Sequence, residues 1–179
     1  MQPPETIDAG EIVLRSWAPE HAEDLAAAVR ASVVELSPFL PFATDAYDVA
    51  AARDFIARSA IGRDEGKQFN YAILTADGEA IGSIGLMTER VEPGALEIGY
   101  WLRTSFTGRG YMTAAVRALS KVAFGLPGIE RLVIRHDAAN GASAAVAAKA
   151  GFAEVGRERR EPQAAGESGV DVIRERRHQ

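Results

Sequence analysis

The chain has 179 residues, of which 47% are hydrophobic and 25% charged, as expected for one globular domain with a substantial core. Its formal net charge of −5 gives no overall basic field to attract nucleic acid, and the absence of cysteine excludes disulfides and thiolate zinc sites. Its three histidines are spread along the sequence, so we expect no metal. There is no signal-peptide pattern and no apolar run of membrane-spanning length, so we expect a cytoplasmic protein without membrane or nucleic-acid partners.

Two prolines near the N-terminus oppose regular structure there. Residues 1–10, which contain Pro3 and Pro4, are therefore expected to form a flexible lead-in. The remaining residues, 11–179, show no composition break, internal repeat or low-complexity linker. We expect them to form a single domain.

Apolar periodicity predicts an alternation of strands and helices along the chain. The predicted strands, rich in branched and aromatic residues, span residues 11–17, 69–75, 80–89, 96–102, 131–136, 152–160 and 170–174. The predicted helices run from Pro19 through Arg30, from a cap at Asp45 or Asp48 to residues 62–66, from Met112 through Ala123, and over residues 140–150. This order predicts an α/β (α+β) fold with one mixed sheet of about seven strands and helices on both faces.

A stretch between the first two predicted helices combines large apolar side chains with helix breakers. Pro38 and Pro41 interrupt any helix, while Phe39, Leu40 and Phe42 are apolar. The stretch is either a loop folded over the core or the apolar lip of a substrate pocket, and both can hold at once. Its three apolar residues are therefore candidate substrate-binding residues.

The sequence Gly108-Arg109-Gly110 lies between a predicted strand and a predicted helix. Two glycines allow backbone conformations barred to other residues, and the start of a helix presents unpaired N–H groups and the positive end of its dipole. Such a turn can bind a phosphate or pyrophosphate, although a plain strand-to-helix turn is the alternative. A dinucleotide-binding fingerprint fails because Thr113 stands where its third glycine would be.

A second group of polar residues follows the predicted strand at residues 131–136. Asn140 and Ser143 lie three positions apart at the start of the next helix, so they share one face near its N-terminus. Ligands of such sheets bind at the carboxyl edge of the strands. Local capping of the helix is the structural alternative for both residues.

Four motifs in this order carry a resemblance to a known family. They are E-I-G-Y-W-L from Glu97, G-R-G-Y-M-T-A-A-V from Gly108, R-L-V-I-R-H-D-A-A-N-G-A-S from Arg131 and K-A-G-F from Lys149. The chain resembles the GNAT superfamily of acyl-CoA N-acyltransferases, and within it the ribosomal-protein N-terminal acetyltransferases of the Rim type. The resemblance implies a GNAT-like, largely antiparallel sheet, acetyl-CoA as acyl donor, and a possible homodimer.

The resemblance also assigns cofactor-binding roles to residues of these motifs. Backbone N–H groups would hold the pyrophosphate at Thr107, Gly108, Arg109, Gly110, Tyr111 and Met112. The strand end would pair with the pantetheine arm at Tyr100, Trp101 and Leu102. Asn140 would lie near the pantetheine amides and Ser143 near the thioester sulfur. Ser105 departs from the Gln or Arg that begins this loop in the family.

The chemistry of acetyl transfer needs few groups. A primary amine must lose a proton before it attacks the thioester carbonyl, and Glu97 is the predicted base because it alternates onto the strand face opposite Ile98. An ion pair with Arg135 is its structural alternative. Ser143 is the predicted partner of the leaving thiolate. His136 is a possible further functional residue, although a lone histidine at a strand end is more often structural.

The prediction is thus an N-acetyltransferase that moves an acetyl group from acetyl-CoA to a primary amine by direct attack in a ternary complex. The acceptor is a protein N-terminal α-amine or a small-molecule amine, and its specificity is expected to depend on residues 32–42 and 161–169. A non-catalytic module that binds coenzyme A or a metabolite on the same fold is the alternative.

Overall fold

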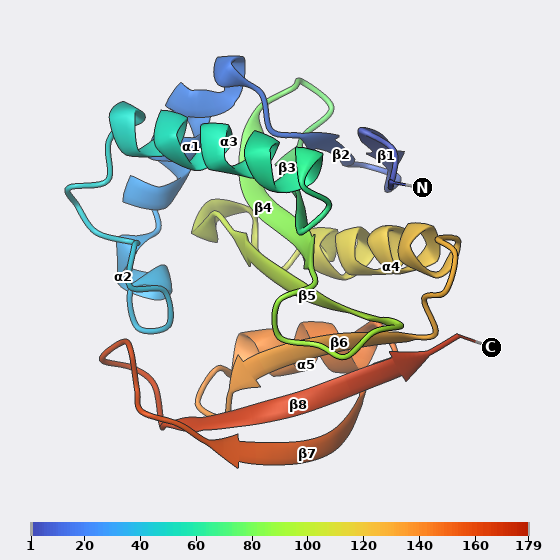
Figure 1. Cartoon of the computed structure of the whole chain (residues 1–179). Coiled ribbons are helices and arrows are strands. Elements are labelled where there is room, and N and C mark those ends of the chain that lie inside the picture. Colours follow the sequence, from blue (N-terminus) through green and yellow to red (C-terminus); the bar gives the residue numbers. More distant parts are fainter. Residues whose placement is uncertain (1, 179) are drawn as a thin grey trace.

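The computed structural model describes residues 2–178, so Met1 and Gln179, the outer ends of the two predicted segments, lie outside the described residues. One eight-stranded sheet in the order β1-β2-β3-β4-β5-β6-β8-β7 forms its centre (Figure 1). The strands are β1 (Thr6–Asp8), β2 (Val13–Ser16), β3 (Gln68–Leu74), β4 (Ala80–Met87), β5 (Ala95–Leu102), β6 (Arg131–Asp137), β7 (Ala153–Arg159) and β8 (Val170–Arg177). Only β5 and β6 pair in parallel among these strands, which confirms the predicted mixed, largely antiparallel sheet.

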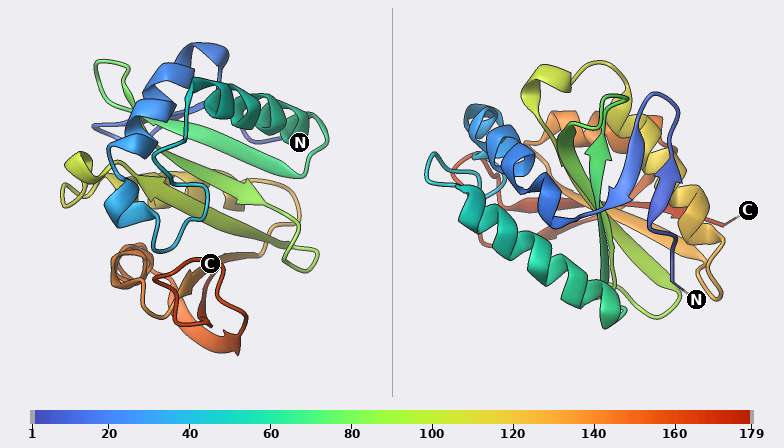
Figure 2. Two further views of the ribbon diagram at one scale, coloured as in Figure 1. Left: turned by 90° about the vertical axis from the view of Figure 1, so that its left-hand side faces the viewer. Right: turned by 90° about the horizontal axis from the view of Figure 1, so that it is seen from above.

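Helices cover both faces of the sheet (Figure 2). The α-helices are α1 (Ala22–Arg30), α2 (Val33–Leu36), α3 (Val49–Asp64), α4 (Tyr111–Phe124) and α5 (Gly141–Lys149), with 3₁₀ turns η1 (Pro19–His21) and η2 (Thr104–Phe106). Helices α1 and α3 bury apolar side chains against β3 and β4, and α4 and α5 bury theirs on the opposite face. Within residues 2–178, no helix is both long and apolar enough to cross a membrane.

The prediction of a flexible lead-in is wrong at residues 6–8, which form strand β1. Ile7 pairs with Leu14 of β2, and its side chain is 6% exposed in the core. The two prolines before it lack N–H groups but still offer carbonyls: Tyr71 donates its hydroxyl proton to the Pro4 carbonyl at 2.8 Å. The segment that contains the prolines can therefore pack against the core through its carbonyl groups, even though prolines lack N–H groups.

Two other boundaries differ from the prediction. Strand β8 continues to Arg177, where a solvated tail was expected from residue 175, because Glu175 forms an ion pair with Arg131 at 3.1 Å. The predicted lip contains the one-turn helix α2, which is too short to show apolar periodicity.

The sheet divides into two halves at β5 and β6. These strands pair only at Ala95↔Arg131, Leu96↔Leu132 and Glu97↔Val133, and their pairing ends there. The carboxyl ends of both strands are therefore free of each other, with β1–β5 on one side of a fork and β6–β8 on the other (Figure 1). This fork positions the candidate site.

Candidate functional site

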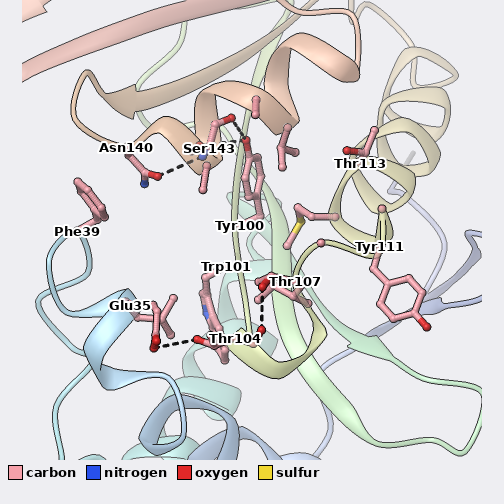
Figure 3. Close-up of a pocket in the computed structure, with 18 of the residues that line it drawn as sticks. Glu35, Phe39, Tyr100, Trp101, Thr104, Thr107, Tyr111, Thr113, Asn140 and Ser143 are labelled. Atoms are coloured by element: carbon pink, nitrogen blue, oxygen red, sulfur yellow. Dashed lines mark hydrogen bonds between the residues drawn. The ribbon is translucent and has the colours of Figure 1, made fainter.

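A pocket of about 500 Å³ lies at the open end of the fork (Figure 3). Its walls come from four segments far apart in the sequence: α2 with the loop after it, the end of β5, the turn into α4, and α5. The pocket is lined by Glu35, Leu36, Phe39, Leu40, Tyr100, Trp101, Leu102, Thr104, Thr107, Gly108, Gly110, Tyr111, Met112, Thr113, Asn140, Ala142, Ser143, Ala145, Val146 and Lys149. Most of the residues predicted to bind cofactor are thus brought together around one cavity.

The turn into α4 has the geometry that the glycine pattern indicates. Gly108 and Gly110 have φ angles of 76° and 80°, in the left-handed region that side chains disfavour. Gly110 is the N-cap residue of α4, so the unpaired N–H groups of its first turn begin directly at the pocket. The segment can therefore receive an anion through backbone groups alone.

Arg109, between the two glycines, does not line the pocket. Its guanidinium lies over the Phe106 ring at 5.0 Å, and its Nη2 donates to the Ser105 carbonyl at 3.1 Å. In this conformation the Arg109 side chain makes its contacts within the loop. Its backbone N–H is therefore the group that is available to a ligand.

Ser143 contacts Tyr100 across the fork, and Asn140 lies at the same end of α5. The Asn140 side chain accepts a hydrogen bond from the Ser143 N–H at 3.1 Å, so the predicted capping role is confirmed. The Tyr100 hydroxyl lies 3.1 Å from both the carbonyl and the hydroxyl oxygen of Ser143 (Figure 3). Because a carbonyl only accepts, the Tyr100 hydroxyl donates to it and can accept from the Ser143 hydroxyl. Burial raises the pKa of Tyr100, so its hydroxyl keeps its proton at neutral pH.

Glu97 lies on the opposite face of β5 and does not line the pocket. Its side chain is 9% exposed and lies within ion-pair distance of Arg90, at 3.9 Å, and Arg135, at 3.8 Å. The predicted pairing with Arg135 is thus confirmed. Burial raises the pKa of Glu97, while Arg90 and Arg135 act to lower it and Asp171 adds to the rise. A carboxylate with a raised pKa is a better proton acceptor near neutral pH than an exposed one.

The predicted substrate-binding residues divide between the pocket and the surface. Phe39 and Leu40 line the pocket. Phe42 does not; it is 43% exposed and packs against Tyr47 and Trp101, with ring centroids 5.9 Å and 6.4 Å away. Because Trp101 itself lines the pocket, Phe42 supports the wall from behind.

Comparison with known proteins agrees with this geometry. A family model described as an acetyltransferase (GNAT) domain matches residues 11–153. This chain belongs to the GNAT acetyltransferase family. As a member of that family it is an acetyl-CoA-dependent N-acetyltransferase, and its relatives place it in the Rim-type group.

The relatives of this GNAT acetyltransferase include ribosomal-protein acetyltransferases. It is 32% identical over 150 residues to "Putative ribosomal N-acetyltransferase YdaF" of Bacillus subtilis (strain 168), covering 83% of this chain and 81% of that protein. It superposes on RimL, a ribosomal L7/L12 alpha-N-protein acetyltransferase in complex with coenzyme A, with a TM-score of 0.87 at 25% identity over 97% of this chain and 98% of that one. A Salmonella typhimurium acetyl transferase that modifies the N-terminal serine of L7/L12 gives 0.84 at 26% identity over 98% and 100% of the two chains.

His136 has a structural position in this GNAT domain. It is buried, its Nε2 accepts from Arg174 Nε at 3.0 Å, and its Nδ1 lies 2.9 Å from the Asp137 carbonyl. A guanidinium only donates and a carbonyl only accepts, so these partners fix the neutral tautomer with the proton on Nδ1. Both ring nitrogens are thus occupied. Among residues 2–178, no three His, Cys, Asp or Glu side chains gather in a way that could hold a metal ion.

Several residues of the site escaped prediction because no local pattern marks them. Glu35 and Leu36 line the pocket from the single turn of α2; they lie within the predicted lip of residues 32–42 but were not singled out there. Lys149 also lines it and was recognised only as part of a motif. Arg90 and Asp171 surround Glu97 but come from a turn and a strand distant in sequence. Only the register of β5, β6 and β8 brings these charges together.

Proposed function

We propose that this acetyltransferase transfers the acetyl group of acetyl-CoA to the α-amine at the N-terminus of a protein, by direct attack in a ternary complex. The observation that carries the proposal is the fork itself. One face presents the N-terminal ends of α4 and α5, and the other presents Glu97. A donor on the first face and an amine on the second would meet in the gap between β5 and β6.

The donor would lie along the pocket. Backbone N–H groups at Gly108, Arg109, Gly110, Tyr111 and Met112 would hold the pyrophosphate at the positive end of the α4 dipole. The Thr107 N–H, also expected to do so, already donates to the Thr104 carbonyl at 3.1 Å. The pantetheine amides would pair with the free edge of β5 at Tyr100, Trp101 and Leu102, and Asn140 would approach them from α5. These contacts use a strand edge that β6 has left unpaired.

The reaction would need one proton acceptor and one hydrogen-bond donor. Glu97 takes a proton from the ammonium group of the acceptor, directly or through a water, and the neutral nitrogen attacks the thioester carbonyl. A carbon–nitrogen bond forms, and backbone N–H groups of residues 100–102 stabilise the oxyanion. The carbon–sulfur bond then breaks, the nitrogen loses its second proton to give the neutral amide, and the leaving thiolate takes up one proton. The Ser143 hydroxyl would stabilise the thiolate by a hydrogen bond and could relay this proton to it. Positioning of amine and thioester would provide much of the rate.

The charge on the Glu97 face of the fork supports a peptide acceptor over a polycationic small molecule. The groove on this face is lined by as many guanidinium groups as carboxylates, with Arg90, Arg131, Arg135 and Arg157 against Glu89, Glu92, Glu158 and Glu175. Glu97 itself is balanced by two neighbouring guanidinium groups. A polyamine or an aminoglycoside carries several ammonium groups and would gain no net attraction here, whereas a protein N-terminus brings one.

An acetyl-CoA consumption assay tests the proposal. Peptides with varied first residues are compared with matched small amines and polyamines, and mass spectrometry locates the acetyl group. We expect turnover of peptides at the α-amine only. Preferred turnover of a polyamine would overturn the acceptor assignment. Binding of coenzyme A in calorimetry without acetylation of any amine would favour the non-catalytic module instead.

A further inference from the structure

Two charged side chains at the base of the fork have buried polar atoms without hydrogen-bond partners. Glu97 Oε2 and Arg135 Nε lie 3.8 Å apart, too far for a hydrogen bond. Within residues 2–178, nothing donates to Oε2, and nothing accepts from Arg135 Nε or Nη1. Arg135 is fixed in place through its third nitrogen, because Nη2 donates to the Arg90 carbonyl at 3.2 Å. Buried polar groups normally have hydrogen-bond partners. We therefore expect a bound ligand, the guest, to supply partners for these three atoms.

The two side chains define what the guest must carry. A carboxylate oxygen only accepts and guanidinium nitrogens only donate, so the guest needs a donor facing Glu97 and, close beside it, an acceptor facing Arg135. The first residue of a peptide has this arrangement, with its α-ammonium group and its carbonyl oxygen attached to one carbon. A lysine ε-amine or an alkylamine has the donor but lacks the adjacent acceptor.

A groove lies next to this position, and the three orphan atoms are closed off from it by neighbouring side chains. Arg135 lines a cavity of about 580 Å³ on the sheet face that carries Glu97, together with Val133 of β6, Ile173 of β8 and the turn between β4 and β5. Glu97 lies next to this groove and is screened by the Arg90 side chain, which is 58% exposed and 3.9 Å from the carboxylate. An exposed ion pair at that distance is weak, so an entering ammonium group can replace it.

We propose that Arg135 is a specificity-determining residue that binds the carbonyl oxygen of the acceptor's first peptide unit while Glu97 receives its amine. The site then selects α-amines of peptides over amines without a neighbouring carbonyl. This inference rests on the proposed function, because it requires a peptide acceptor. It adds recognition of the acceptor's backbone, which would not depend on the side chain of the acceptor's first residue.

The test compares one peptide with a close isostere. The substrates are an alanine-initiated tetrapeptide and the same molecule with an E-alkene in place of its first peptide bond, which keeps the shape and the amine but removes the carbonyl. Wild type, Arg135→Gln and Arg135→Lys are assayed for kcat and KM with both. Arg131→Gln is the matched control, because Arg131 lies four residues earlier on the same face, lines the same groove and is paired with Glu175 at 3.1 Å.

We expect Arg135→Gln to lower kcat/KM for the peptide by about 10- to 100-fold, mainly through KM, which is the loss of a charge-assisted hydrogen bond. The alkene should be a poor substrate of wild type and should lose little more in the variant. Arg135→Lys should lie between, and Arg131→Gln should match wild type. Affinity for coenzyme A should be unchanged throughout.

Two results would overturn the inference. Equal losses for peptide and alkene would mean that Arg135 acts only on Glu97 or on the fold. Equal turnover of the two substrates by wild type would leave the transferase function standing but remove any role for the carbonyl. Absence of turnover with every substrate would instead refute the proposed function, and the inference would fall with it.

Discussion

At the scale of single residues, the environment of Glu97 decides how well it can act as a base. Burial disfavours its charged form, whereas Arg90 and Arg135 favour it without making close contact. The net effect is a pKa raised above the ordinary carboxyl value, which makes the carboxylate a stronger proton acceptor. A closer ion pair would lower its pKa and weaken it as a proton acceptor.

Glu97→Gln should keep the shape of the site and remove the proposed base. We expect kcat/KM to fall by about 100- to 1000-fold, the usual contribution of a positioned acid or base. Calorimetry with coenzyme A should show unchanged affinity. Glu35→Gln serves as the comparison, since Glu35 is exposed and bound to Thr104. A large loss in the Glu35 variant with none in the Glu97 variant would assign the base to Glu35.

The direction of the Glu97 shift also sets a pH dependence. Because burial raises its pKa in the folded state, the neutral form is the one that folding favours, and this contribution to stability is lost as pH rises through the folded-state pKa. Activity should move oppositely, rising as Glu97 ionises. Profiles of kcat/KM for wild type should show this rise on the acidic side, and Glu97→Gln should lack it.

Part of this residue-level picture was available from sequence. Strand alternation placed Glu97 on the strand face opposite Ile98. It also suggested Arg135 as the partner of Glu97, because side chains in neighbouring strands alternate with the same two-residue period. Arg90 and Asp171 could not be found in this way. They reach Glu97 from a turn and from the last strand, and their approach depends on the sheet order, in which β8 lies between β6 and β7.

At the scale of elements, the turn into α4 depends on backbone conformation more than on side chains. Gly110→Ala should weaken coenzyme A binding by about tenfold, because left-handed geometry costs an L-residue roughly 1–2 kcal/mol and the N–H groups would shift. Gly78→Ala is the matched control: its φ is 85°, a Cβ there also meets nothing, and it lies in the β3–β4 turn. Both should lose similar stability, and only Gly110→Ala should lose affinity. Equal affinities would contradict the assigned pyrophosphate site.

The loop between β7 and β8 depends on a buried carboxylate. Asp137 is 1% exposed and accepts from the N–H groups of Ala139, Ser168 and Gly169, with Arg160 Nη2 3.5 Å away. Burial acts to raise the pKa of Asp137, but these hydrogen bonds outweigh it and hold the value at about 2. Its stabilising contribution is therefore present above the ordinary pKa near 4 and disappears as pH falls toward 2.

Asp137→Asn should accordingly destabilise the protein at neutral pH by about 1–3 kcal/mol, the cost of weakening charge-assisted hydrogen bonds. Urea unfolding at pH 7 and at pH 3 measures the difference from wild type. The difference should shrink at the lower pH, where the wild-type carboxylate begins to take up a proton. A constant difference would show that the charge contributes nothing to the folding of this loop.

Elements with strong periodicity or clear turn residues were predictable, and two of the short ones were not. Strand β1 has three residues and α2 has four, so neither is long enough to show apolar periodicity. Both form because other segments of the chain pair or pack with them. The same limit applies to the pocket wall at Glu35 and Leu36. By contrast, the turn at Gly108 and Gly110 and the cap at Asn140 follow from local chemistry and appeared where the sequence indicated.

At the scale of the whole molecule, three of the contacts that join the two halves of the sheet follow the fork from its base to its mouth. The first is the short pairing of β5 with β6, and the second is the contact of Tyr100 with Ser143. The third lies at the mouth of the fork, where the Gly166 N–H donates to the Pro38 carbonyl at 2.9 Å. The two segments expected from sequence to govern specificity, residues 32–42 and 161–169, thus touch each other. Together they limit how wide an acceptor can be.

Gly166→Val should widen this mouth. A Cβ at Gly166 would lie 2.3 Å from the Pro38 Cβ and 2.8 Å from its carbonyl oxygen, so the two segments must separate. We expect a loss of about 1–3 kcal/mol of stability from overpacking, higher kcat/KM for branched or bulky amines, and unchanged affinity for coenzyme A, whose predicted contacts lie elsewhere. Gly78→Val is the control, because its φ of 85° also costs stability, a Cβ there meets nothing within 4 Å, and it lines neither the pocket nor the groove. If the relative rates for slender and bulky acceptors stay the same in Gly166→Val, the contact holds the halves together without selecting the substrate.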